Sequence, residues 1–391
     1  MNDQVSAVSM QHIDVLFGPR SGRKEALRLL DQGSDRDEIL TKTGMVLGVA
    51  DASLEVPKGS ISVLMGLSGS GKSSLLRCVN GLNTVTRGVL NVQTAQGAVN
   101  VAACQGRALR QLRRSNLAMV FQQFGLLPWA TVRENIGFGL SVRGESKTLI
   151  EERVQQQLTL VGLDAWADKA IHTLSGGMQQ RVGLARAFAT DADILLMDEP
   201  FSALDPLIRE HLQDELLALQ DRLKKTILFV SHDLDEALKL GNRISIMEGG
   251  RIVQTGTVDD IVFKPANDYV RRFVANINPL SVLHARNLMK PVVMDDNNNL
   301  VHSASGLCVI MQAGRPVRCL LNGKQHEVRQ IDLVADSGDH SDVVVCVREN
   351  TPIKALLHRS STSSLCTLVA DERGLVNGVI DSQDLCAALS V

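Results

Sequence analysis

Residues Gly66–Ser73 read GLSGSGKS, a glycine-rich loop with the spacing G-x-x-x-x-G-K-[ST] that is typical of phosphate binding. The apolar run Ile61–Met65 before it predicts a buried strand, and Lys72–Val79 after it predicts the start of a helix. The glycines let backbone N–H groups face inward, and together with the helix start they form a cradle for anions. The residues expected to bind a nucleotide here are Gly66, Leu67, Ser68, Gly69, Ser70, Gly71, Lys72, Ser73 and Ser74.

Two side chains of this loop have separate expected roles. Lys72 supplies a point charge to the β- and γ-phosphates, and Ser73 can give its hydroxyl to Mg²⁺. A chance glycine-serine loop is the alternative, but the strand before it and the helix after it argue against chance.

The bulk properties describe a globular chain with more than one domain. With 391 residues, 44% of them hydrophobic, the chain can form two or three domains with ample cores. Its net charge of −2 indicates neither nucleic-acid binding nor a strongly basic membrane surface. No apolar run approaches the ~18 residues that span a bilayer, and the N-terminus lacks a signal pattern. We therefore expect a soluble chain that needs a partner for any membrane role.

Two further buried strands end in polar residues. Ile194–Met197 reads ILLM and precedes Asp198 and Glu199, whereas Thr226–Val230 reads TILFV and precedes Ser231 and His232. Strand, loop and helix recur along this part of the chain. The pattern predicts an α/β fold with a mostly parallel sheet and helices on its faces.

The polar residues after these strands suggest hydrolytic chemistry. Asp198 can hold the Mg²⁺ shell through water, and Glu199 can orient or deprotonate the attacking water. Gln122 can sense both metal and water, although a surface glutamine is an equal alternative. His232 can hydrogen-bond a γ-phosphate and hold Glu199, or it can be a partly buried structural histidine. Two solvated acids at a strand end would be the alternative for Asp198 and Glu199, but the buried run before them disfavours it.

A second glycine-rich turn occurs at Leu174–Arg181, which reads LSGGMQQR. Ser175, Gly176 and Gly177 open the helix Met178–Ala189, so the start of this helix is a second anion site. One nucleotide does not need two such sites from one chain. Both sites have a use if two chains pack head to tail, because each chain then caps the nucleotide that the other chain binds. A plain glycine turn with a helix cap is the alternative.

The remaining stretches suggest the organisation of the chain. We expect a nucleotide-binding domain over residues 1–275, a helical subdomain at about 131–173 and an insertion at Gly22–Thr43 that carries two short helical patterns. From Pro279 the motifs stop, and residues 279–391 are expected to form a separate region. Its two weakly similar halves are Arg286–Asp332 and Val343–Val391, the second of which predicts strand, helix, strand, turn, strand and helix.

Taken in order, these motifs resemble the ABC transporter ATPase family over about two-thirds of the chain. The motifs that carry the resemblance are Gly66–Ser73, Gln122, LSGGMQQR, ILLMDEP, the stretch Ser202–Asp205 and Ser231–Asp233. The resemblance implies a P-loop ABC ATPase with a RecA-like core, an antiparallel β subdomain and a helical subdomain. It implies ATP and Mg²⁺ as cofactors.

The resemblance also implies roles for single residues. Glu199 would be the catalytic base, assisted by His232 and Gln122, and the metal would lie at Ser73, Gln122 and Asp198. Gln179 in the signature stretch and Asp205 in the D-loop would join Ser175, Gly176 and Gly177 in binding nucleotide. Phe17, the nearest aromatic residue before the phosphate loop, would stack on adenine. The distance in sequence between Phe17 and the loop is longer than usual in the family, and the insertion accounts for the extra residues.

The insertion, the stretch MGLSGSGKSSLLRCVNGL and the C-terminal tail narrow the resemblance to importers of glycine betaine, proline betaine and choline. This implies a homodimer on the cytoplasmic face of the bacterial inner membrane, as a peripheral subunit. It implies transmembrane permease subunits as partners and, indirectly, a periplasmic or lipid-anchored substrate-binding protein. The tail resembles a CBS regulatory module in its second half, although Asp381 stands where the nucleotide-binding form of that module has Ser or Thr.

Two other functions stay open at this point. An importer for another solute, such as methionine or a polyamine, is disfavoured by the insertion. A soluble ABC ATPase that acts on DNA or ribosomes would need a long coiled-coil insertion or two cassettes in one chain, and this sequence shows neither.

Overall fold

The computed structural model describes residues 5–275, 284–295, 299–302, 307–312, 315–321, 323–331, 343–360, 365–371, 373–381 and 383–385. The chain divides into two compact units, Met1–Ala275 and Asn276–Val391. Within the described residues, none of the helices combines the length and the hydrophobicity that crossing a membrane requires.

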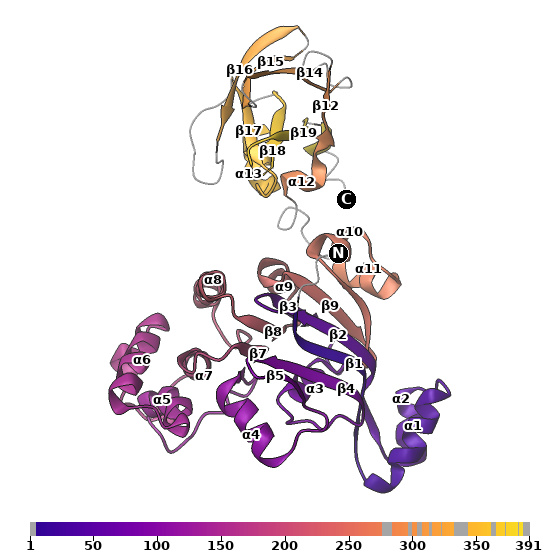
Figure 1. The fold of residues 1–391 in the computed structure, drawn as a ribbon, viewed down its shortest axis with the longest axis vertical. Helices are drawn as coiled ribbons and strands as arrows, with labels where there is room; N and C mark the ends of the chain where they lie inside the picture. The colour runs from indigo at the N-terminus through magenta and orange to yellow at the C-terminus, as the bar shows by residue number, and fades with distance from the viewer. Residues whose placement is uncertain are drawn as a thin grey trace. The chain divides into compact units, whose positions relative to one another are not determined.

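The first unit is built on a six-stranded sheet with the order β10-β9-β3-β8-β7-β6. Figure 1 labels four of its strands, β3, β7, β8 and β9. Neighbouring strands run parallel, except that β10 is antiparallel to β9. Every residue of β3, β7 and β8 is buried, as expected for parallel strands covered on both faces. The predicted parallel sheet is therefore confirmed. The strands are β3 (Ile61–Met65), β6 (Leu117–Val120), β7 (Ile194–Asp198), β8 (Thr226–Val230), β9 (Arg243–Glu248) and β10 (Arg251–Gly256).

A second, antiparallel sheet has the order β2-β1-β4-β5. Its buried side chains share one hydrophobic cluster with helix α3 (Lys72–Val79), so this sheet covers the helix that follows the phosphate loop. The strands are β1 (Ser6–Phe17), β2 (Val46–Pro57), β4 (Arg87–Thr94) and β5 (Gly97–Asn100).

A helical region lies to one side of the first unit, at α5, α6 and α7 in Figure 1. Helix α5 (Val132–Arg143) begins at a capping box in which Thr131 and Glu134 satisfy each other's backbone N–H groups. It packs with α6 (Lys147–Leu160) and α7 (Gly176–Ala189) in the same hydrophobic cluster as β7. The other helices of the unit are α4 (Gly106–Ser115), α8 (Pro206–Leu223), α9 (Leu234–Leu240), α10 (Val258–Phe263) and α11 (Asp268–Val274), with 3-10 turns at Asp164–Trp166 and Ile171–Thr173.

The insertion forms a small helical hairpin of its own. A 3-10 turn at Arg20–Gly22 leads into α1 (Arg23–Asp31), and α2 (Arg36–Thr43) follows after a short turn. The apolar faces of the two helices form a separate cluster that includes Leu47 of β2. This cluster attaches the hairpin to the antiparallel sheet.

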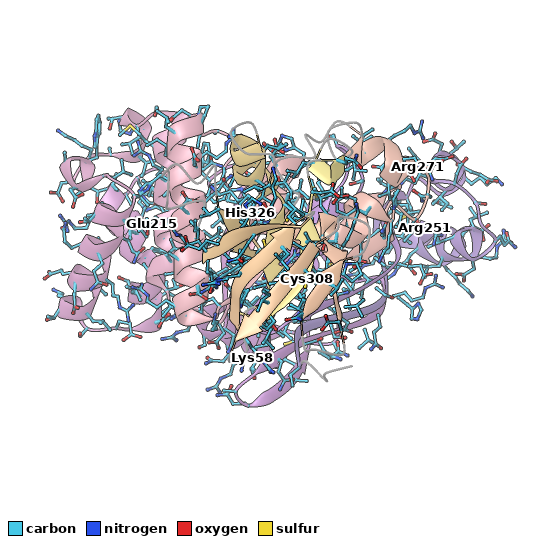
Figure 2. The ribbon with its side chains drawn as sticks, turned by 90° about the horizontal axis from the view of Figure 1, so that it is seen from above. Lys58, Glu215, Arg251, Arg271, Cys308 and His326 are labelled. Atoms are coloured by element: carbon cyan, nitrogen blue, oxygen red, sulfur yellow. The ribbon has the colours of Figure 1, made fainter. Side chains whose placement is uncertain are left out.

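The second unit contains a nine-stranded sheet with the order β11-β19-β18-β17-β16-β15-β14-β13-β12. Figure 2 labels Cys308 on β14 and His326 on β16 of this sheet. The strands are β11 (Lys290–Pro291), β12 (Val293–Met294), β13 (Leu300–His302), β14 (Leu307–Gln312), β15 (Arg315–Leu321), β16 (Lys324–Gln330), β17 (Val344–Arg348), β18 (Thr367–Ala370) and β19 (Val376–Ile380), and the helices are α12 (Ala285–Leu288) and α13 (Ile353–Ser360).

The two halves of this unit differ in structure. The second half has the predicted order of strand β17, helix α13, strand β18, turn and strand β19. In the first half, β12 to β16 pair antiparallel one after another, and no described helix separates them. Two matching halves are therefore not found. A CBS identity stays a prediction for the second half, and most of its predicted last helix lies outside the described residues.

Candidate functional site

The phosphate loop runs from the end of β3 to the start of α3 and needs glycine at two points. Gly66 has φ of +144° and Gly71 has φ of +102°, which favour glycine over other residues. A Cβ at Gly66 would collide with the carbonyl oxygen of Met247, and one at Gly71 with the carbonyl oxygen of Gly48. The loop is thus packed against β2 and β9, and only a bare backbone fits there.

Lys72, the first residue of α3, reaches back over the loop. Its buried ammonium group donates to the carbonyl oxygens of Gly66, at 2.8 Å, and Leu67, at 3.0 Å. Burial lowers the pKa of Lys72, while the nearby charges of Glu199 and Asp198 act in the opposite direction. The ammonium is therefore held over the loop by two backbone carbonyl groups.

Asp198 ends strand β7 and is held by two residues of α3. The Oγ of Ser73 donates to one carboxylate oxygen at 2.6 Å, and a guanidinium nitrogen of Arg77 donates to the other at 2.8 Å. The carboxylate is buried, so both partners are needed to compensate for its lost hydration.

A hydroxyl beside a buried carboxylate fits Mg²⁺, which prefers oxygen ligands and commonly binds through one or two carboxylates together with substrate phosphates. Across the residues that the structure describes, no group of three or more His, Cys, Asp or Glu side chains is arranged to hold a metal ion. A metal at the predicted set of Ser73, Gln122 and Asp198 would thus take its other ligands from phosphate and water.

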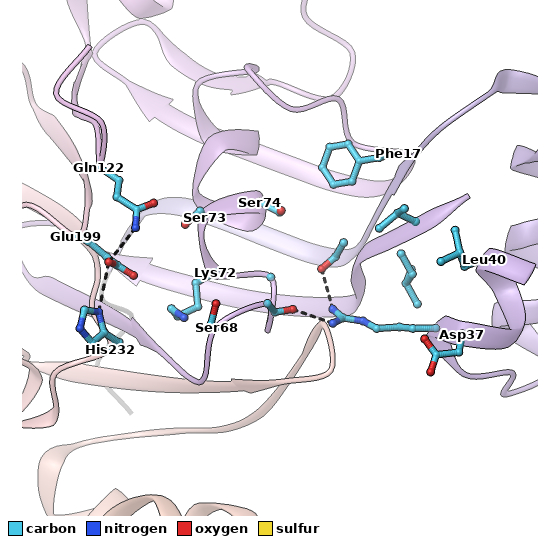
Figure 3. Close-up of a pocket in the computed structure, with 16 residues that line it drawn as sticks. Phe17, Asp37, Leu40, Ser68, Lys72, Ser73, Ser74, Gln122, Glu199 and His232 are labelled. Carbon is cyan, nitrogen blue, oxygen red and sulfur yellow. Dashed lines mark hydrogen bonds and ion pairs between the residues drawn. The ribbon is translucent and has the colours of Figure 1, made fainter. Parts of the chain in front are cut away.

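Glu199 follows Asp198 and is fixed in an unusual conformation. Its φ is +50°, which is uncommon for a residue with a side chain, and its N–H donates to Val230 at 3.0 Å. Its carboxylate accepts from the side-chain amide of Gln122 at 3.0 Å and lies 3.3 Å from Nδ1 of His232 (Figure 3). Three loops that follow β6, β7 and β8 therefore converge on one carboxylate.

These groups line a cleft of about 700 Å³. Of the residues predicted from the sequence, the cleft contains Phe17, Ser68, Gly69, Gly71, Lys72, Ser73, Ser74, Gln122, Glu199 and His232. Asp198 contacts the cleft through Ser73, and the loop residues Gly66, Leu67 and Ser70 complete the loop without lining it. Figure 3 shows Phe17 on the opposite side of Lys72 from Glu199 and His232.

The other predicted residues lie elsewhere in the unit. Ser175 caps α7 by accepting from the N–H of Met178, and Asp205 caps α8 in the same way. Gln179 donates its side-chain amide to the carbonyls of Ile171 and Leu174, at 3.3 and 3.1 Å. Within residues 5–275, all of which are described, none of Ser175, Gly176, Gly177, Gln179 and Asp205 lines the cleft.

Sequence reasoning missed several residues of the site, among them Gln180 and Arg77, which support the predicted side chains. Gln180 is buried, donates to the carbonyl of Glu199 at 3.1 Å and accepts from the N–H of Ala203 at 2.9 Å, so it fixes the backbone of Glu199. Arg77 follows Ser73 by four residues, which places both on one face of α3. This four-residue spacing from Ser73 is the sequence feature from which Arg77 could have been predicted as a site residue.

Known proteins resemble this chain in sequence and in fold. A family model described as "ABC transporter" matches residues 49–202. The glycine betaine/carnitine transport ATP-binding protein GbuA of Listeria monocytogenes is 37% identical to the chain, and the match covers 99% of this chain and 98% of that protein. The chain belongs to the ABC transporter family.

Other members of the family extend the comparison. The glycine betaine/proline betaine transport system ATP-binding protein ProV of Escherichia coli is 38% identical over 98% of this ABC transporter chain and 97% of its own. The trimethylamine N-oxide transport system ATP-binding protein TmoW of Pelagibacter ubique is 47% identical over 74% of this chain and 82% of its own. A solved dimer of the ATP-binding cassette MJ0796 with ADP and phosphate is 26% identical, with a TM-score of 0.55, over 64% of this chain and 98% of that one. The family resemblance of the motifs and the predicted ABC ATPase fold are thereby confirmed.

Proposed function

We propose that this ABC transporter subunit binds and hydrolyses ATP to energise the import of a quaternary amine, namely choline, glycine betaine or proline betaine. The observation that supports ATP hydrolysis most directly is Glu199, held between Gln122 and His232 beside the phosphate loop. The cargo class is supported by two transport ATP-binding proteins that match nearly the whole chain and are named for glycine betaine.

Different residues of the cleft have different roles in the proposed reaction. The loop N–H groups and Lys72 bind the phosphates and offset their charge. Glu199 accepts the proton of a water molecule, and His232 and Gln122 keep its carboxylate aimed at that water. Mg²⁺ bound by Ser73 and Asp198 would neutralise phosphate charge. The positive φ of Glu199 is held by the backbone hydrogen bonds that its N–H makes to Val230 and its carbonyl to Gln180, and these bonds fix the position of the base.

The proposed working form is a homodimer. Ser175, Gly176 and Gly177 begin α7, a helix of sufficient length to present an anion-binding N-terminus, but they do not line the cleft of their own chain. The solved cassette of similar fold is a dimer. In the proposed arrangement these residues, together with Gln179 and Asp205, cap the ATP of the partner chain.

The proposed partner on the membrane side is a permease, which would hold the subunit at the cytoplasmic face of the inner membrane. A groove of about 340 Å³ lies between the sheet core and the helical region. Exposed Phe138 and Val142 supply apolar surface there, and Arg113 and Arg143 supply positive charge. We propose that a short amphipathic helix of the permease, carrying acidic residues, docks in this groove. A periplasmic or lipid-anchored binding protein would deliver the amine to the permease.

The test of this function has two parts. Purified chain should hydrolyse ATP with Mg²⁺, and Glu199→Gln should retain ATP binding while losing turnover by at least about 100-fold, since general base catalysis contributes on that order. Lys72→Ala should instead weaken ATP binding. Host cells that carry Glu199→Gln should then lose uptake of labelled glycine betaine, choline or proline betaine. Normal turnover by Glu199→Gln would contradict the assignment of the base.

A second candidate cargo is trimethylamine N-oxide. The observation that favours it is the 47% identity to TmoW, although that match covers a smaller share of this chain than the betaine transport proteins do. Competition by unlabelled trimethylamine N-oxide in the same uptake assay would separate the two cargoes.

A further inference from the structure

Arg36 joins the insertion to the phosphate loop. It is the first residue of α2, whose start is fixed by Asp35, which accepts from the N–H of Glu38 at 2.8 Å. One guanidinium nitrogen donates to the carbonyl of Gly69 at 2.8 Å, and the other donates to the carbonyl of Gly48 at 3.1 Å. A single side chain thus links the phosphate loop to strand β2.

The position of Arg36 depends on close packing against backbone. A Cβ at Gly250, in the turn between β9 and β10, would lie 2.7 Å from its guanidinium. Within residues 5–275 no ion pair within 4.0 Å involves Arg36, and its Nε is buried without an acceptor. Its guanidinium is therefore balanced by backbone carbonyls and by no ion pair, at the edge of the phosphate loop and in a cleft that Asp37 also lines.

Helix α2 also contributes apolar surface to the cleft. Leu40 lines it together with Phe17 and Val46, and these side chains are 45%, 38% and 51% exposed. Phe17 and Val46 are paired across β1 and β2, next to the insertion. Figure 3 shows Leu40 and Phe17 on the side of the cleft away from Glu199. An apolar group at this end suits the flat face of a base.

We propose that the α1–α2 insertion forms one wall of the nucleotide site, with Arg36 positioning the phosphate loop and Leu40 contacting the base. This inference rests on the proposed ATP binding and adds residues that lie outside the motifs. Arg36 is a positioning residue, because it acts through the Gly69 carbonyl and through charge. Leu40 is a binding residue, because it would touch the base with Phe17 and Val46.

The two roles can be separated by ligand. Inorganic tripolyphosphate has the phosphates of ATP but no base, so it should depend on Arg36 and not on Leu40. ATP should depend on both residues. Arg28, which lies in the same insertion and pairs with Glu25 on the surface, should matter for neither ligand.

The experiment titrates full-length parent, Arg36→Met, Arg36→Lys, Leu40→Asp and the control Arg28→Ala with ATP and with tripolyphosphate, each with Mg²⁺, by calorimetry. Arg36→Met should weaken both ligands about tenfold, as expected when one charge-assisted contact is lost. Arg36→Lys, which can keep one carbonyl contact, should recover part of the loss. Leu40→Asp should weaken ATP about tenfold and leave tripolyphosphate unchanged.

Steady-state kinetics give an independent readout. Arg36→Met should raise the KM for ATP more than it lowers kcat, because the chemistry at Glu199 lies at the other side of the cleft. Unchanged affinities in folded Arg36→Met, or in Arg36→Lys if the first variant does not fold, would overturn the role of Arg36. Equal losses of both ligands in Leu40→Asp would overturn the base contact. A parent chain that binds neither ligand would instead refute the proposed function.

Discussion

The side-chain amide of Gln122 donates to the carboxylate of Glu199 at 3.0 Å, which connects the loop after β6 to the loop after β7. Gln122 also begins the segment that leads to the helical region. That segment is fixed by Asn135 of α5, whose side chain exchanges hydrogen bonds with the backbone of Leu127 at 2.8 and 3.1 Å. A shift of the helical region would therefore be transmitted to the partner of Glu199.

We expect Gln122→Ala to separate ATP binding from turnover. The variant keeps the phosphate loop and Lys72, so its affinity for ATP should stay close to that of the parent. Its kcat should fall roughly tenfold, because Glu199 loses a positioning hydrogen bond. The neighbouring Gln123→Ala, at an exposed position, is the matched control. Equal rates for both variants would show that the Gln122 contact has no role in turnover.

A second prediction concerns the stability of the loop that carries the base. Gln180 is buried and satisfies the carbonyl of Glu199 and the N–H of Ala203. Gln180→Leu would leave both backbone groups without these partners, at about 1–3 kcal/mol for each group that stays buried and unpaired. The free energy of unfolding in urea should drop by that order, and ATP turnover should fall with it. Gln156→Leu on exposed α6 is the control and should change stability little; similar losses in both would contradict the prediction.

The centre of the site was predictable because its signals are local. Strands β3, β7 and β8 are short, mostly apolar runs. Strand β3 leads directly into the glycine loop, and the apolar runs of β7 and β8 are followed directly by polar residues. Parallel strands bring such ends together, so Lys72, Glu199 and His232 could be placed at one edge from sequence pattern alone.

The outer wall of the site could not be found in the same way. Arg36 has a role only because Gly48, Gly69 and Gly250, which come from three separate segments, pack around it. Neither a sequence motif nor a periodicity predicts these tertiary contacts. The prediction for the first half of the second unit was wrong for a related reason. Short apolar runs predict strands but not which strands pair. Strands β12 to β16 form an antiparallel series, where a copy of the second half was expected.

The third prediction uses the buried carboxyl of Glu236 on α9. It accepts from Ser231 at 2.6 Å and from Gln213 at 3.2 Å. Burial raises the pKa of Glu236 above its ordinary value of 4.5, although these hydrogen bonds oppose the shift. The folded state therefore keeps this proton to a higher pH than the unfolded chain does. The stability that Glu236 contributes is complete below the unfolded pKa and is lost as the pH rises through the raised one.

Glu236→Gln should remove this part of the pH dependence, because an amide does not titrate. Urea unfolding of parent and variant between pH 4 and pH 8 would be compared, with exposed Glu151→Gln on α6 as the control. The stability of the parent relative to Glu236→Gln should be greatest at the acid end and decrease steadily as the pH rises. Parallel pH profiles for the parent and Glu236→Gln would contradict the prediction.

The last prediction concerns removal of the second unit. The chain divides at Ala275, and the cleft, its motifs and both hydrophobic clusters around the core sheet lie before that residue. A chain that ends at Ala275 should therefore fold and hydrolyse ATP at a rate close to that of the full chain. In membranes with the permease, however, its transport should respond differently to ionic strength or to a small effector, since we propose that residues 279–391 regulate the transporter. ATPase and uptake would be measured for both forms across a series of salt concentrations. A well-folded truncated chain without ATPase activity would show that the second unit is needed for catalysis, and identical salt profiles would refute its regulatory role.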